Sequence, residues 1–252
     1  MPIALFATCV IDQLAPNIGL AALDVLDRAG AKAAFPMGQT CCGQPFFNAG
    51  YRDEAARLAR ATVTVLEPFD TVVVPSGSCT AMIRVHYPQL FPADDPIQPA
   101  VDKLAKRTFE FSEFLAKKLG VTADQGRAPP LEPNRPAAGD GPVTVHDGCH
   151  GLRELGLGAA CRSLLGGIGT EVRELADRQQ CCGFGGAFSV KFDRISTSMG
   201  NAKADAIGAT GAKTVVTCDP SCLLQIRGIL ERRGSDVTVV HLAEYLAQRA
   251  GR

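Results

Sequence analysis

Short apolar segments alternate with longer amphipathic segments along the chain. Residues 3–8, 32–36 and Thr71–Val74 are brief and apolar, which predicts strands that are buried within the fold. Apolar residues recur at helical spacing within 17–29, and a further helix is expected over 50–67. Strands that alternate with helices are typical of parallel α/β sheets.

The same alternation returns in the second part of the chain. Strands are expected near 143–147, 170–175, 213–217 and 236–240, and helices near 156–165, 192–208, 221–233 and 241–249. The sequence therefore predicts an α/β protein made of two pseudo-twofold-related repeats. Each repeat is expected to be a small, mostly parallel sheet flanked by helices.

Proline and glycine indicate where the repeats end. Residues 121–142 are rich in both, which predicts a linker between a first repeat over 1–120 and a second repeat over 143–252. Residues 88–99 also contain several prolines and predict a loop within the first repeat.

The two repeats share a cysteine pattern. Cys9 precedes Cys41-Cys42-Gly43 by the same interval by which Cys149 precedes Cys181-Cys182-Gly183. Cysteine is a rare residue, so such matched spacing is best explained by duplication. It predicts that each half of the chain builds a similar metal–thiolate site.

Both cysteine sets continue at the ends of predicted strands. Each set closes with a serine–cysteine pair, at Ser78-Cys79 and at Ser221-Cys222. Ligands of parallel α/β folds gather at the carboxyl ends of the strands, where Cys9, Cys79, Cys149 and Cys218 are expected to lie. The cysteines of one half are therefore predicted to meet at one edge of its sheet.

Bulk composition narrows the class of function. The chain has 252 residues and a formal net charge of zero, and no basic stretch points to nucleic acid. The sequence contains neither a signal-peptide pattern nor an apolar run that could span a bilayer, so we expect a cytoplasmic protein. In that compartment ten cysteines favour metal binding or redox chemistry over a disulfide framework.

The number of thiols differs between the two sets. The candidate ligands are Cys9, Cys41, Cys42 and Cys79 in the first, and Cys149, Cys181, Cys182, Cys218 and Cys222 in the second. Five thiols exceed the four that a zinc ion or a cubane [4Fe–4S] cluster requires, which favours iron–sulfur chemistry with unusual ligation. Pro75 stands opposite Cys218 in the first repeat. A cubane, a smaller cluster, zinc or an iron open to substrate are therefore alternatives there.

Several motifs resemble those of the cysteine-rich CCG domain. They are Gln39-Thr40-Cys41-Cys42-Gly43-Gln44-Pro45, Gly50-Tyr51-Arg52-Asp53, Pro75-Ser76-Gly77-Ser78-Cys79, Cys181-Cys182-Gly183-Phe184-Gly185-Gly186 and Phe188-Ser189-Val190-Lys191. This domain occurs in the cysteine-rich subunit of heterodisulfide reductase, in iron–sulfur subunits of glycolate and glycerol-3-phosphate oxidation systems, and in lactate utilization protein A. The sequence most resembles the last group.

The resemblance implies an iron–sulfur subunit of a cytosolic oxidoreductase system that oxidises L-lactate to pyruvate. It implies electron transfer through thiolate-ligated clusters and partner subunits that include a second iron–sulfur protein. In the heterodisulfide reductase relatives five cysteines hold each noncubane [4Fe–4S] cluster, which implies such a cluster in the second repeat. The alternatives are a thiol–disulfide reductase subunit and a zinc-stapled assembly protein without enzymatic activity.

A few further residues carry candidate chemistry. Cys161 lies on an apolar helical stripe and is interpreted as a buried structural thiol outside the second set. His146 and His150 flank Cys149 and are candidates for donating to cluster sulfur, relaying protons or binding a carboxylate. The first repeat has Phe6 and Val10 at these positions, so neither histidine is needed to build a centre.

Two arginines recur after the closing cysteines. Arg84 and Arg227 could meet an anionic substrate, although surface salt bridges are the favoured interpretation.

Overall fold

Each half of the chain forms a parallel four-stranded sheet in the computed structural model, which describes residues 2–121 and 141–249. The strands are β1 (Ile3–Leu5), β2 (Ala33–Ala34), β3 (Thr71–Val74), β4 (Thr108–Glu110), β5 (Val143–His146), β6 (Val172–Arg173), β7 (Thr214–Thr217) and β8 (Thr238–His241). The strand order is β2-β1-β3-β4 in the first sheet and β6-β5-β7-β8 in the second. The identical order confirms the predicted α/β repeats.

The helices of the first half connect its strands. They are α1 (Cys9–Leu14), α2 (Pro16–Arg28), α3 (Gln44–Asn48), α4 (Arg52–Leu66), α5 (Gly77–Ala81), α6 (Gln98–Arg107) and α7 (Phe111–Glu113). Two π-helical turns, η1 (Met82–His86) and η3 (Phe114–Lys118), and the 3-10 turn η2 (Tyr87–Gln89) complete this half.

The helices of the second half follow the same plan. They are α8 (Cys149–Arg153), α9 (Gly158–Gly167), α10 (Ala187–Lys191), α11 (Asp193–Ala209), α12 (Pro220–Arg232) and α13 (Leu242–Arg249). In both halves a short helix begins at the first cysteine, which is Cys9 in α1 and Cys149 in α8.

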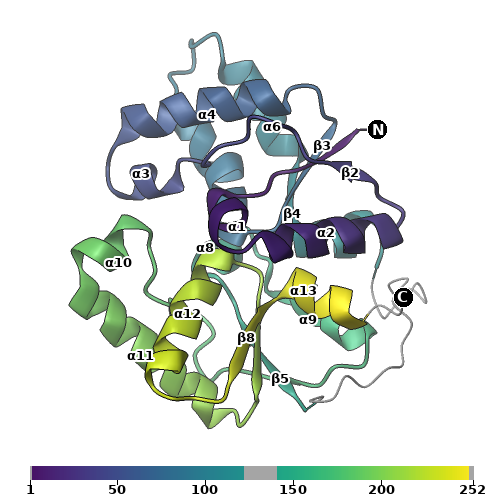
Figure 1. Cartoon of the computed structure of the whole chain (residues 1–252). Coiled ribbons are helices and arrows are strands. Elements are labelled where there is room, and N and C mark those ends of the chain that lie inside the picture. Colours follow the sequence, from purple (N-terminus) through teal and green to yellow (C-terminus); the bar gives the residue numbers. More distant parts are fainter. Residues whose placement is uncertain (1, 122–140, 250–252) are drawn as a thin grey trace.

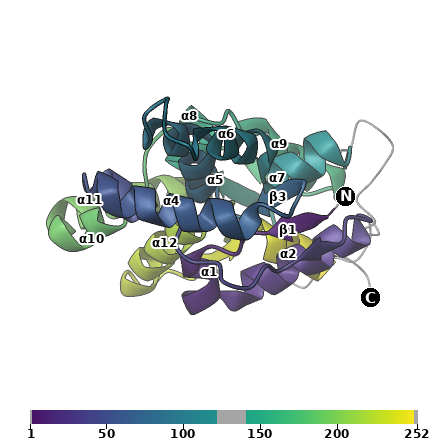
Figure 2. The same ribbon diagram turned by 90° about the horizontal axis from the view of Figure 1, so that it is seen from above.

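The two faces of the first sheet pack against different layers. Ala4, Val72 and Val74 point to one side, where they join the buried residues of α4 and α6. Leu5 and Val73 alternate to the opposite side, as the period of a strand requires, and join a core shared with the second half. Figure 2 shows α2 and α6 on opposite sides of this sheet.

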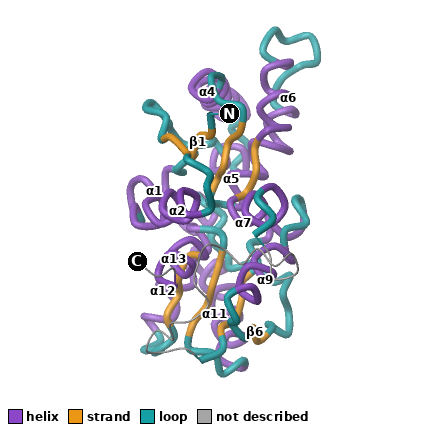
Figure 3. The backbone as a smooth tube through the Cα atoms, turned by 90° about the vertical axis from the view of Figure 1, so that its right-hand side faces the viewer, coloured by secondary structure: helices purple, strands orange, loops and turns teal. Residues whose placement is uncertain are grey.

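The shared core joins the two halves. It contains Leu5 and Val73 of the first sheet together with Val145 and Val216 of the second. Figure 1 shows the first half stacked on the second, with α2 beside α13 at the junction, and Figure 3 shows the same stacking from the side. The sheets therefore share an apolar layer.

Most predicted elements agree with the structure to within a few residues. Thr71–Val74 is observed as predicted, because a short β-branched segment buried on both faces has a strong pattern. No sequence pattern indicated β4, which follows α6 directly and ends in a glutamate. The proline-rich segment 88–99 is a loop only in part, since α6 begins at Gln98. Most of the predicted linker, residues 122–140, lies outside the described residues.

Candidate metal centres

The first cysteine set lies where β1, β3 and the segment after β2 come together. Cys9 opens α1, whose first turn is capped by Thr8, and Cys79 lies in the first turn of α5. The Ser76 hydroxyl accepts a hydrogen bond from the Cys79 backbone N–H at 3.3 Å, which fixes the start of this helix. Cys41 and Cys42 follow β2 in a turn.

The four thiols of the first set form a continuous chain of contacts. The Sγ atoms of Cys42 and Cys79 lie 3.2 Å apart. Hydrogen bonds also join the Cys41 side chain to Cys9 and to Cys42. The cysteines predicted as ligands in the first half are thus neighbours in space.

The second set repeats this geometry. The Sγ atoms of Cys182 and Cys222 also lie 3.2 Å apart, and those of Cys149 and Cys181 lie 3.8 Å apart. A side-chain hydrogen bond joins Cys181 to Cys182. Each sheet therefore presents four thiols in the same order.

One thiol in each set is strongly acidified. Hydrogen bonds from Cys42 and Cys9 lower the pKa of Cys41 to about 3, and bonds from Cys149 and Cys182 lower the pKa of Cys181 to about 2. A backbone N–H contributes in both halves, from Gly43 and from Gly183, at 3.4 Å from the sulfur. Each set therefore stabilises a thiolate, which is the form of cysteine that binds metal.

The turns after the paired cysteines require glycine. Gly43 and Gly183 have φ values of 89° and 90°, in the left-handed region that side chains other than hydrogen disfavour. A Cβ added to Gly183 would lie 2.7 Å from the backbone oxygen of Ser196. This turn packs Gly183 against α11 and lets its own backbone N–H donate to the Cys181 sulfur.

Cys218 is expected from the sequence to be the fifth thiol of the second set, and Cys161 is expected to lie apart. The structure instead places these two thiols together. Its thiol hydrogen bonds with Cys161 of α9 and with Ser112, and the bond to Cys161 is the main reason that its pKa is raised. The end of β7 directs Cys218 into the shared core, whereas Cys222 lies in the first turn of α12 and faces Cys182. The fifth thiol therefore lies with Cys161.

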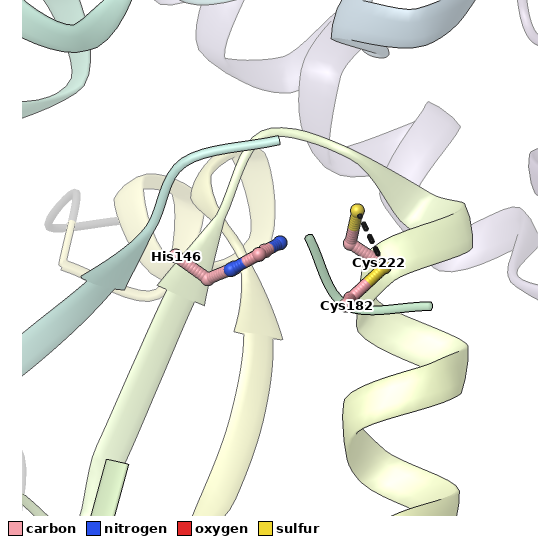
Figure 4. A group of neighbouring side chains, drawn as sticks. All are labelled: His146, Cys182 and Cys222. Carbon is pink, nitrogen blue, oxygen red and sulfur yellow. Dashed lines mark hydrogen bonds between the residues drawn. The ribbon is translucent and has the colours of Figure 1, made fainter. Parts of the chain in front are cut away.

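His146, which the sequence offered as a hydrogen-bond donor, proton relay or carboxylate-binding residue, lies at the position of a possible metal ligand in the second set. A ring nitrogen of His146 and the Sγ atoms of Cys182 and Cys222 all lie within 4.8 Å of one another. Figure 4 shows the imidazole directed toward the two cysteines. The only signal in the sequence was its position at a strand end, three residues before Cys149.

A lysine is buried near the same set. The Lys203 side chain on α11 has no exposed surface, and its Nζ donates to the Asp177 carbonyl at 3.3 Å. Burial lowers the pKa of Lys203, while Asp177 and the thiolates of Cys182 and Cys181 counteract that effect. Its charge thus compensates thiolate charge in the second half.

Asp219 links the loops that carry the closing cysteines of both halves. Its Oδ2 accepts the Ser78 backbone N–H at 2.8 Å and lies 3.3 Å from the Ser76 hydroxyl. Its Oδ1 accepts the Ser221 backbone N–H at 3.1 Å, which caps α12. Because Cys79 and Cys222 directly follow these groups in the chain, the two cysteine sets lie on either side of one buried junction.

The arginines and the second histidine considered in the sequence analysis make contacts within the fold. Arg84 forms an ion pair with Glu113 at 2.6 Å, which agrees with the favoured salt-bridge interpretation. Arg227 instead donates to the backbone carbonyl of Val239 at 3.0 Å. The carboxylate of Glu154 joins His86 and His150, at 3.0 and 2.6 Å. This last group connects the first half to α8.

A small cavity of about 30 Å³ lies between the halves, beside the second set. It is lined by His146, Cys161, Cys218 and the buried carboxyl of Glu110, among others. Burial raises the pKa of Glu110 to about 7. The volume suits one or two water molecules.

The donor set fits a soft metal or an iron–sulfur cluster. Thiolates are the ligands that iron–sulfur clusters and zinc select, and each half supplies four neighbouring thiols, of which one has a strongly lowered pKa. The structure therefore offers two chemically similar candidate centres.

Comparison with known proteins identifies the family. The CCG cysteine-rich domain matches residues 3–84 and 143–227. The chain belongs to this family. It is 40% identical over 247 residues to lactate utilization protein A of Macrococcus caseolyticus, with 98% of this chain and 96% of that protein covered. It is 39% identical over 251 residues to lactate utilization protein A 2 of Bacillus mycoides and to lactate utilization protein A of Bacillus cereus, with 99% of this chain and all of each relative covered.

Membership of the CCG family agrees with the duplicated architecture, since the two matched segments contain the two cysteine sets. Within residues 2–121 and 141–249, no helix has the length and apolar character needed to cross a bilayer.

Proposed function

We propose that this protein is an iron–sulfur subunit of a cytoplasmic oxidoreductase system that oxidises L-lactate to pyruvate. The observation that carries the proposal is the pair of matching four-thiol sets, each with an acidified thiolate, on either side of the Asp219 junction. When bound, iron–sulfur clusters supply one-electron redox chemistry whose potential depends on ligands, charge and solvent exposure.

The ligands follow from the thiol contacts. Cys9, Cys41, Cys42 and Cys79 would hold the first group, and Cys149, Cys181, Cys182 and Cys222 the second. Cys218 would join the second group as a fifth thiolate only by turning away from Cys161. In this division of the chain, residues 1–120 and 143–252 each build one centre, with 121–142 between them.

Lactate as the substrate rests on the relatives, which are named lactate utilization protein A and align along nearly the whole chain. That name supports a place among the proteins of a lactate utilization system. We propose that its partners in lactate oxidation include a second iron–sulfur protein. In lactate oxidation, the residues of this chain would bind the clusters, exclude water from the buried thiols and hold the two centres close to the Asp219 junction.

A second candidate function is reduction of disulfides. The observation that favours it is the Cys161–Cys218 thiol pair beside the cavity, because two neighbouring thiols can exchange with a disulfide through a mixed-disulfide intermediate. Cys161 is buried, Cys218 is half-buried and the pKa of Cys218 is raised, so the pair would have to become exposed and lose a proton before it could attack. Exchange yields one disulfide in the protein and two thiols in the substrate, and two electrons with two protons would restore the pair.

Metal analysis tests the proposal first. Protein purified without oxygen should contain iron and acid-labile sulfide, with Mössbauer spectra of iron–sulfur clusters, whereas zinc alone would contradict it. Rapid mixing of the reduced protein with pyruvate or with a disulfide then separates the two candidates. With its partner subunits present, reoxidation by pyruvate is expected, and reoxidation by the disulfide alone would favour the second candidate.

A further inference from the structure

The imidazole of His146 is buried in a position that is energetically unfavourable for an unpaired polar group. It is the last residue of β5, a central strand, and only 1% of its surface is exposed. Neither ring nitrogen has a hydrogen-bond partner among the described residues. A buried polar group without a partner costs about 1–3 kcal/mol, so an imidazole here needs a reason.

The neighbouring carboxylates do not provide that reason. Both oxygens of Asp147 bond to Arg162, at 2.9 Å each, and one of them also bonds to Arg178. Asp219 is occupied by backbone N–H groups of both halves. His146 is therefore not a core histidine held by an adjacent acid.

The imidazole instead points to the second cysteine set. Its nitrogen lies within 4.8 Å of the Sγ atoms of Cys182 and Cys222 (Figure 4). Sulfur and nitrogen ligands of one tetrahedral ion, with bonds of about 2.3 and 2.1 Å, stand about 3.5 Å apart. A small side-chain movement is enough to bring the three donors onto one metal ion.

The two halves differ at this point. The position of His146 is held by Phe6 in the first half, which cannot bind metal. Cys218, the thiol that would distinguish the second set by sequence, lies with Cys161. The extra donor available to the second set is therefore a nitrogen.

We infer that His146 is a nitrogen ligand of the second centre, in addition to the cysteines of that set. This inference rests on the proposed function, because it requires a metal or cluster at those thiols. A metal-bound imidazole is neutral, whereas a thiolate carries a negative charge. Ligand type is one of the factors that set the potential of an iron–sulfur centre, so the second centre should differ from the first in potential although each has four thiolates.

Labelled histidine gives a direct readout of this bond. The whole protein, with both centres assembled, is prepared with ¹⁵N-histidine, and nitrogen hyperfine coupling is measured by pulsed EPR in the paramagnetic oxidation state. One strongly coupled histidine nitrogen is expected. It should be lost in His146→Phe, which copies the first half, and the midpoint potential of one centre should change while that of the other stays the same.

Two further variants distinguish loss of the nitrogen ligand from a folding defect. His146→Cys replaces the nitrogen by a thiol, so it should retain the iron of the wild-type protein and lose the nitrogen coupling. His241 is equally buried, and its Nδ1 caps α13. His241→Asn should retain the coupling.

Absence of a strong coupling in the wild-type protein would overturn the inference, as would a coupling that survives in His146→Phe. Iron and sulfide content decides the proposed function separately. If the protein binds zinc instead, the proposed function fails, and cobalt(II)-substituted protein reports histidine ligation by the same coupling.

Discussion

The two halves share one plan for gathering thiols but differ in the groups around them. Both place four cysteines in the same order, with an acidified thiolate bonded to a glycine N–H. The second half adds His146 and the buried Lys203, whereas the three arginines of the corresponding helix α4 are exposed. The repeated backbone therefore positions the ligands, while a few substituted side chains set charge and donor type.

The largest effect should come from the paired cysteines. Cys42→Ser should remove the metal of the first half and Cys182→Ser that of the second, with a loss of roughly half of the bound iron in each case, because each thiol touches the closing cysteine of its own half. Iron analysis and optical spectra measure the loss. Cys161→Ser is the matched control and should retain the metal. Loss of all iron from either variant would show that the centres are not independent.

The junction between the halves should be the next most sensitive feature. Asp219→Asn preserves shape but leaves one of the two bonded oxygens as an amide NH₂, which faces a backbone N–H. Because this group is buried, we expect the free energy of unfolding to fall by about 3 kcal/mol. Urea denaturation of the metal-loaded protein measures it. Asp205→Asn, at an exposed pair with Arg233, should change it by less than about 1 kcal/mol.

The strand-end residues Glu110 and His241 should give the halves opposite responses to pH. They hold equivalent positions, opposite Val74 and Thr217, and each caps the helix that follows. Burial raises the pKa of Glu110 from 4.5 to about 7, so the folded state retains a proton that the unfolded state loses, and stability falls as pH rises through that interval. Burial lowers the pKa of His241 from 6.5 to about 4, so stability falls as pH drops through that interval.

Unfolding free energies between about pH 5.5 and 7.5 test these slopes. In Glu110→Gln, the decrease in the free energy of unfolding between about pH 5.5 and 7.5 should be smaller by about 2 kcal/mol. In His241→Asn, the decrease in the free energy of unfolding toward acid pH should be smaller than in the wild-type protein. Glu231→Gln, on the exposed side of α12, should leave both slopes unchanged. Equal slopes in all variants would show that neither carboxyl nor imidazole controls the response.

The smallest effect should be electrostatic. Lys203→Met removes a buried positive charge near Cys181 and Cys182. We expect the second centre to become harder to reduce by roughly 1–2 kcal/mol, on the order of 40–80 mV for one electron. Redox titration measures the shift, and Arg60→Met on α4 is the control for the first half. A shift of the first centre alone would contradict the assignment of Lys203 to the second.

The duplicated α/β architecture could be predicted from the amino-acid sequence. Strong local patterns such as Thr71–Val74 report burial directly, and the spacing of Cys9 and Cys41 is repeated at Cys149 and Cys181 because the same strands and turns deliver them. These features depend on neighbours along the chain, so periodicity and spacing are sufficient to predict them.

The side chains that meet across the fold are selected by tertiary packing. Nothing local distinguishes Cys218, which turns to Cys161, from Cys222, which faces Cys182. The strand β4 forms without an apolar pattern because it pairs with β3, and Asp219 finds its partners in the other half. Such contacts depend on how two sheets pack together, and the packing of distant segments leaves no periodic trace in the sequence.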